Sequence, residues 1–190
     1  MNHQAVAAYD WLIRPTKRWM EIPILISFNL ILVALAYVSI NLPFSPVPIT
    51  GQTFGVILIS MILGRTRAVA VVSAYLAEGA LGLPVLAGGK GGLVALMGPT
   101  GGYLFGFLAA AFIVGHLSDK GWHRTYVTSV VAMVVGTGAI FACGMFWLGV
   151  MVPESSLFMI GFWPFVPGAL VKIAIAAVIL PSVYRFFHER

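Results

Sequence analysis

The chain has 190 residues, of which 60% are hydrophobic and only 9% charged, and its mean hydropathy is +0.99. A soluble domain carries about 25% charged residues, so this chain has too little polar material to cover a water-soluble globule and is expected to be an integral membrane protein. Its net charge of +5 does not indicate nucleic-acid binding, because the basic residues flank apolar segments instead of gathering on one face. The single cysteine, Cys143, excludes an internal disulfide and a cysteine metal cluster.

Residues 1–21 are expected to form a cytoplasmic segment at the membrane interface. Arg14, Lys17 and Arg18 precede a full-length apolar span, and no small-residue cleavage site follows them. The remainder, residues 22–187, is expected to be one membrane domain.

Six apolar segments follow in chain order. At about 20 residues per membrane-spanning helix, they predict an all-α bundle of six transmembrane helices with short loops. The second and fourth are short for a full crossing at about 1.5 Å per residue, so they are expected to begin or end in structured loops buried in protein. The segments are Ile22–Leu42, Gly51–Leu63, Ala68–Leu86, Tyr103–Leu117, Tyr126–Val152 and Phe162–Val183.

The positions of the basic residues predict the orientation. Lysines and arginines concentrate in cytoplasmic loops, and here they occur before the first segment, after the sixth, and in every second loop. This alternation places both termini in the cytoplasm of a multi-pass protein of the bacterial cytoplasmic membrane. Two lysines depart from the rule. Lys90 falls in an outer loop, and Lys172 lies inside the last apolar segment.

The two main outer loops are rich in proline and glycine. Residues 43–50 contain three prolines, and residues 88–102 contain seven glycines. This composition favours tight, defined turns, as expected of loops that fold over a ligand. In the first loop, Thr50 can cap the following helix. Gln52, Thr53 and Phe54 either serve that cap or contact an amide-like ligand.

Five further residues carry charge or lie where an anion would bind. Lys90 stands among glycines that let backbone approach a ligand, and Gly101 and Gly102 open a helix whose amino-terminal dipole favours an anion. Glu78 and Lys172 are intramembrane charges, which are costly and usually functional; they either pair with each other or face a ligand. Together these features indicate capture of a small anion.

Four motifs resemble those of the BioY family, the biotin-specific S components of energy-coupling factor (ECF) transporters. The run LPFSPVPITGQT at residues 42–53 is long and unusual, and shorter matches occur in later loops. They are GLP at 82–84, GGKGG at 88–92 and GPTGGY at 98–103. The similarity covers residues 43–120 and 164–172, more than half of the chain.

The resemblance implies a six-helix bundle whose outer loops cover biotin, a transmembrane coupling protein, and two cytoplasmic ATPases that drive transport. Biotin offers a carboxylate, a ureido group and an apolar ring. The resemblance therefore implies that Lys90 and Lys172 meet the carboxylate and ureido groups in either order. Polar or aromatic contacts are expected from Gln52, Thr53, Phe54, Glu78, Thr100, Tyr103 and Trp163. No cofactor, metal, catalytic residue or nucleic-acid partner is expected, and the oligomeric state is left open.

Two features depart from the family pattern. The family has an aspartate three residues before the lysine of the last helix, where this chain has Ala169. An acceptor for the ureido N–H groups is therefore missing. The first helix also lacks the paired small-xxx-small alanines expected for docking a coupling protein, since Ala34 and Ala36 precede Val38 and Ile40. The best small-residue row, Gly102, Gly106 and Ala110, is expected to pack internally.

Three alternatives remain. In the first alternative the chain is a transporter of another kind, either an S component for another small vitamin or a solitary biotin carrier that works without ATPases. Ala169 favours the S component for another vitamin. In the second alternative the chain is an intramembrane protease, and in the third it is a purely structural membrane subunit. The protease hypothesis has candidate hydroxyls and bases but no spaced partners among them: Ser60, Ser73, Ser129, His116 and His123.

Overall fold

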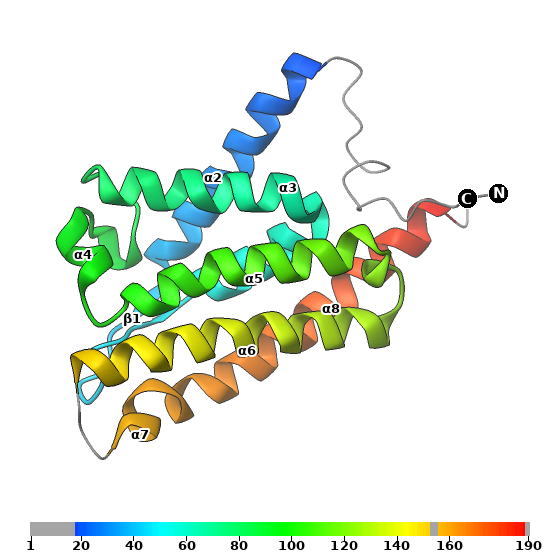
Figure 1. The fold of residues 1–190 in the computed structure, drawn as a ribbon. Helices are drawn as coiled ribbons and strands as arrows, with labels where there is room; N and C mark the ends of the chain where they lie inside the picture. The colour runs from blue at the N-terminus through cyan, green and yellow to red at the C-terminus, as the bar shows by residue number, and fades with distance from the viewer. Residues whose placement is uncertain (1–17, 153–155, 189–190) are drawn as a thin grey trace.

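The computed structural model describes residues 18–152 and 156–188; the predicted interfacial segment 1–21 lies almost wholly outside them. Five long helices dominate the fold (Figure 1): α2 (Glu21–Tyr37), α3 (Gln52–Ala80), α5 (Gly101–Asp119), α6 (Tyr126–Met151) and α8 (Val166–His188). Shorter elements fill the loops: η1 (Arg18–Met20), β1 (Ser39–Ile40), β2 (Ile49–Thr50), η2 (Ala87–Gly89), α4 (Leu93–Met97), η3 (Trp122–Arg124), α7 (Leu157–Gly161) and η4 (Trp163–Phe165). The strands pair antiparallel, with Ser39 opposite Thr50 and Ile40 opposite Ile49.

Helix α3 is two antiparallel arms joined at Gly64. Gly64 has φ 73° and ψ 178°, a conformation outside the helical region that glycine adopts readily. Gln52 and Tyr75 are 23 residues apart yet hydrogen-bonded. In one straight helix they would be separated by about 35 Å, so the chain reverses at Gly64. The arms, residues 52–63 and 65–80, correspond to the second and third predicted segments. The prediction of six apolar helices is therefore confirmed.

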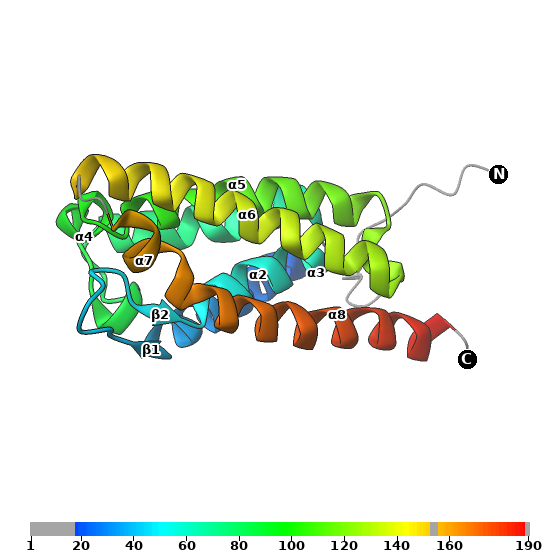
Figure 2. The same ribbon diagram turned by 90° about the horizontal axis from the view of Figure 1, so that it is seen from below.

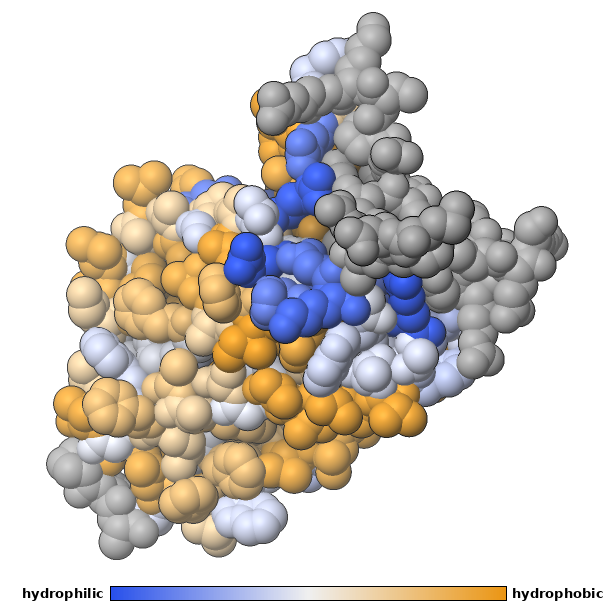
Figure 3. Space-filling model, turned by 45° about the vertical axis from the view of Figure 1, so that its right-hand side comes forward, coloured by the Kyte–Doolittle hydropathy of each residue, from blue (hydrophilic) through white to orange (hydrophobic). Residues whose placement is uncertain are grey.

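Charged side chains gather at the end of the bundle that holds the Gly64 turn. The Arg67 guanidinium bonds the Glu21 carboxylate at 2.6 Å, and the Arg65 backbone N–H donates to Asp119 at 3.2 Å. These contacts bring the start of α2, the Gly64 turn and the end of α5 together. Figures 1 and 2 show the short strands, α4 and α7 at the opposite end. In Figure 3 the hydrophilic surface is concentrated at one end, and most of the remaining visible surface is apolar.

Helix α5 lies at the centre of the bundle, between α3 and α6. A side chain at Gly102 would meet Trp147 Cβ at 2.2 Å, and one at Gly106 would meet Ile140 Cα at 2.9 Å. Ala110 is fully buried. These small residues allow α6 to approach α5 closely, which confirms their predicted internal packing.

Four helical stretches within the described ranges are long and apolar enough to cross a membrane by themselves: Gln52–Ala80, Gly101–Asp119, Tyr126–Met151 and Leu157–Ala176. Helix α2 has 17 residues. It ends at Tyr37, five residues before the predicted Leu42, because the chain there enters β1. A length criterion omits α2 because it is short, and it counts the two arms of α3 as one stretch. This is why it finds four spans in the described residues where there are six apolar helices.

Candidate functional site: a ligand pocket beneath the loops

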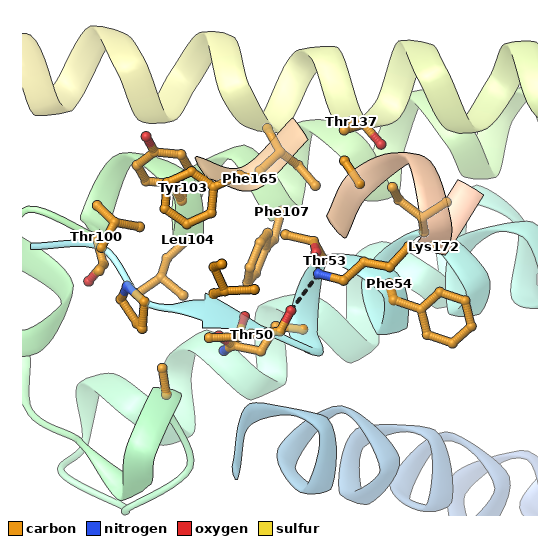
Figure 4. A pocket seen from close by; sticks show the side chains of 18 of the residues that line it. Thr50, Thr53, Phe54, Thr100, Tyr103, Leu104, Phe107, Thr137, Phe165 and Lys172 are labelled. Carbon is orange, nitrogen blue, oxygen red and sulfur yellow. Dashed lines mark hydrogen bonds between the residues drawn. The ribbon is translucent and has the colours of Figure 1, made fainter. Parts of the chain in front are cut away.

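A pocket opens between the helices at the end that carries the short strands (Figure 4). It contains about 1040 Å³ of space free of protein atoms, including its open mouth. Its walls come from the first arm of α3, from α5, α6 and α8, and from two loops, the lid loop (residues 38–51) and the glycine loop (residues 81–100). Most lining side chains are apolar. The polar lining residues are Thr50, Gln52, Thr53, Lys90, Thr100, Tyr103, Thr137 and Lys172.

The lid loop is folded by its own backbone and fastened at its tip. The Gly51 N–H donates to Val38 O at 2.9 Å and closes the hairpin formed by β1 and β2. A side chain at Gly51 would lie 2.8 Å from Leu35 O, so glycine lets the hairpin rest against α2. At the tip, the Ser45 hydroxyl donates to Ile160 O at 2.6 Å. This bond ties the lid loop to α7, more than a hundred residues further along the chain.

Lys172 reaches from α8 to the junction between the lid loop and α3. Its Nζ donates to Thr50 O at 2.6 Å and to Thr53 Oγ1 at 2.8 Å (Figure 4). A lysine ammonium has three N–H donors, so one remains for a ligand. No carboxylate lines the pocket among the residues that the structure describes. The charge is therefore held by neutral oxygens, which favours a ligand acceptor beside it.

Gln52 lines the pocket at the first turn of α3. It is 3% exposed, and its Nε2 donates to the hydroxyl of Tyr75 in the second arm of α3. The Tyr75 hydroxyl donates in turn to Val85 O at 2.9 Å in the glycine loop. One chain of hydrogen bonds thus links the pocket wall to the glycine loop.

The glycine loop brings Lys90 to the mouth of the pocket. The Leu86 N–H donates to Lys90 O at 3.0 Å, and the Gly92 N–H donates to Gly79 O at 2.7 Å, which anchors the loop on the end of α3. A side chain at Gly91 would lie 2.3 Å from Leu83 O, so only glycine fits this turn. The Lys90 side chain is exposed. Lys90 is therefore a lining residue that is open to solvent, whereas the Lys172 ammonium is hydrogen-bonded inside the pocket.

Aromatic rings form much of the apolar wall. Tyr103 and Phe165 lie with ring centroids 6.3 Å apart. The Tyr103 hydroxyl donates to Gly161 O at 2.7 Å, so this residue offers the pocket its ring and not its hydroxyl (Figure 4). Phe107 is 2% exposed. Trp163, which sequence reasoning also proposed for the wall, is 58% exposed and is not a lining residue; Phe165 lines the pocket instead.

All of the predicted site residues line this pocket except Glu78 and Trp163. Glu78 lies half-buried near the end of α3, and Lys172 bonds Thr50 and Thr53, so the suggested Glu78–Lys172 pair is absent between these two described residues. Sequence reasoning missed Thr137, the polar lining residue of α6, and the rings of Phe107, Phe141 and Phe165. A lone threonine in an apolar helix gives little signal, because its pocket-facing position depends on how α6 packs.

A membrane-embedded helix bundle with a mostly apolar pocket, two lysines and several amide or hydroxyl groups beneath folded loops defines a membrane protein that binds a small, partly polar molecule. The chain belongs to the BioY family: the model of that family matches residues 12–189. It is therefore a multi-pass membrane protein of a transporter family.

Individual relatives agree with this assignment. The biotin transporter BioY of Thermotoga maritima is 41% identical over 164 residues, which cover 86% of this chain and 95% of that protein. The biotin transporter BioY of Rhodobacter capsulatus is 37% identical over 179 residues, covering 84% and 90%. The crystal structure of the S-component for biotin from an ECF-type ABC transporter matches with a TM-score of 0.75 at 25% identity, covering 90% of this chain and 95% of that one.

Proposed function

We propose that this chain captures biotin and mediates its uptake as the S component of an ECF-type transporter. The observation that carries the proposal is the pocket itself. Lys172 at the α3 junction and Lys90 in the glycine loop both line one mostly apolar pocket, in a fold similar to that of an S-component for biotin. Relatives named biotin transporters match almost from end to end.

The lining residues of the pocket match the functional groups of biotin, taken from the ureido group inside to the carboxylate at the mouth. The ureido group has one carbonyl acceptor and two N–H donors, and the third N–H of Lys172 can donate to that carbonyl. Gln52 and Thr137 provide neutral acceptors for the N–H donors. Phe107 and Phe165 provide apolar surface for the sulfur-containing ring and the aliphatic chain.

The carboxylate of biotin then lies at the mouth with Lys90. A carboxylate loses much hydration when it is fully buried, and the exposed ammonium of Lys90 can pair with it while water still reaches both. Lys172 is already bonded to Thr50 and Thr53 and has one N–H left, which matches a single carbonyl acceptor better than a two-oxygen anion.

Ala169 lines the pocket three residues before Lys172. A carboxylate there would accept a ureido N–H, and a hydrogen bond to a charged group contributes about 1.5–3 kcal/mol. We therefore expect this chain to bind biotin through neutral acceptors and with lower affinity than a variant carrying Ala169→Asp.

The partners and orientation follow from the same proposal. The charged end of the bundle faces the cytoplasm, both termini lie on that side, and the lid loop and glycine loop face outward. A membrane coupling protein and cytoplasmic ATPases supply the energy, and the chain itself carries out no catalysis. A solitary carrier is the competing arrangement for the same ligand.

Uptake of labelled biotin tests the proposal. The chain is expressed in a bacterium that lacks its own biotin transporter, with and without an ECF coupling module. Uptake should rise with the module and be competed by desthiobiotin but not by thiamin or riboflavin. Competition by one of these vitamins instead of desthiobiotin would favour the alternative ligand that Ala169 suggested. Equal uptake without the module would favour the solitary carrier.

A further inference from the structure

Tyr75 is a completely buried tyrosine that lies behind the pocket wall and is not itself a lining residue. Its hydroxyl makes two hydrogen bonds. It accepts from Nε2 of the pocket residue Gln52, and it donates to Val85 O at 2.9 Å. Because this hydroxyl makes both bonds inside an apolar bundle, the direction of each bond constrains the group at its other end.

The number of protons fixes which way the Gln52 amide faces. A backbone carbonyl such as Val85 O can only accept, so the single proton of the Tyr75 hydroxyl goes to it. The same hydroxyl must then accept from Gln52, and only the NH₂ side of the amide can donate. A flipped amide would set its oxygen against the tyrosine oxygen with no proton between them. Gln52 Oε1 is left over, and it accepts no hydrogen bond from any residue that the structure describes.

We propose that Tyr75 is a positioning residue that orients the Gln52 amide so that Oε1 accepts an N–H from the bound ligand. This assignment rests on the proposed function for the identity of the ligand. Acceptors are scarce in the pocket, because lysines only donate and no carboxylate lines it among the described residues. A threonine hydroxyl can rotate and act as either donor or acceptor, whereas the oriented Gln52 amide presents only its acceptor to the ligand.

The neighbours of Gln52 complete the pattern. Lys172 binds Thr50 and Thr53, which lie on either side of Gln52 in the sequence. The Lys172 donor is therefore bonded to the residues on either side of the Gln52 acceptor, at the start of α3. A carbonyl flanked by N–H groups, as in a cyclic urea, presents the complementary acceptor and donor on adjacent atoms. The arrangement selects ligands that keep the N–H beside the carbonyl.

Tyr37 provides a matched control for a purely structural role of Tyr75. The Tyr37 hydroxyl donates to Pro84 O at 2.6 Å, the carbonyl immediately before Val85. Tyr37 thus fastens the glycine loop as Tyr75 does, but it contacts no pocket amide through that hydroxyl. If Tyr75 only fastened the loop, Tyr37→Phe and Tyr75→Phe would change ligand selectivity alike.

The test measures dissociation constants for biotin and for its two isomers methylated at one ureido nitrogen. The proteins are the wild-type chain, Gln52→Met, Tyr75→Phe and Tyr37→Phe, purified in lipid nanodiscs. Biotin affinity should fall about tenfold in Gln52→Met and Tyr75→Phe, whereas affinity for the isomer that lacks the relevant N–H should change less than threefold. Tyr37→Phe should retain the wild-type ratio between the affinity for biotin and the affinity for that isomer. Gln52→Met carries the test if Tyr75→Phe fails to fold, which thermal unfolding detects.

The two levels of failure are distinguishable. If the wild-type chain binds biotin but the ratio persists in Gln52→Met, or falls equally in Tyr37→Phe, the positioning role is wrong and the proposed function stands. If the folded wild-type chain does not bind biotin, the proposed function fails and the acceptor assignment falls with it.

Discussion

Replacement of Lys172 by methionine removes the ammonium while keeping most of the side-chain length. In the wild-type chain the ammonium donates at 2.6 Å to Thr50 O and at 2.8 Å to Thr53 Oγ1, and its third N–H is proposed to reach the ligand carbonyl. A hydrogen bond to a charged group contributes about 1.5–3 kcal/mol. Loss of the ligand bond alone should therefore weaken biotin binding by about 10- to 150-fold.

The variant should also loosen the lid loop, because Thr50 O loses its partner at the junction between the lid loop and α3. Calorimetric titration gives the dissociation constant, and thermal unfolding of the same sample reports folding. Lys120→Met is the control, since Lys120 is an exposed lysine at the end of α5, away from the pocket. A dissociation constant within threefold of wild type in a folded Lys172→Met protein would refute the role assigned to this lysine.

Three further predictions test other parts of the molecule. Ser45→Ala removes the bond that fastens the lid loop to α7, so biotin should dissociate several-fold faster in stopped-flow displacement; an unchanged off-rate would contradict the fastening role. Lys90→Ala should slow association at low salt, with the difference shrinking as ionic strength rises; a salt-independent defect would argue against an electrostatic role. Gly102→Ala should destabilise the bundle by about 1–3 kcal/mol through a clash with Trp147, measured by denaturant unfolding. Gly138→Ala, which meets no atom within 4 Å, should not destabilise the bundle.

Hydropathy and charge were sufficient to predict the helices. Six apolar segments were expected and six apolar helices form, because a membrane-spanning chain must satisfy its backbone hydrogen bonds within each helix. The division of α3 was foreseen from Arg65 and Arg67, which mark a loop in an otherwise apolar stretch. The conformation of Gly64, which makes that loop a sharp reversal, could not be read from composition.

The site was predicted from residues that are unusual in a membrane helix or loop, and this is why Lys172 and Gln52 were found. Glu78 is equally unusual but lies outside the pocket, because its position near the end of α3 sets its surroundings. Thr137 and Tyr75 were missed since their roles arise only when α6 and the two arms of α3 pack together. Chemistry that depends on one residue can be predicted from sequence, whereas a hydrogen-bonded chain across three segments requires the fold.

The most direct test of biotin recognition is calorimetric titration of biotin into the purified chain in lipid nanodiscs, without any partner protein. The proposal predicts saturable binding of one biotin per pocket, with a dissociation constant in the nanomolar to micromolar range. A folded chain that binds no biotin would contradict it.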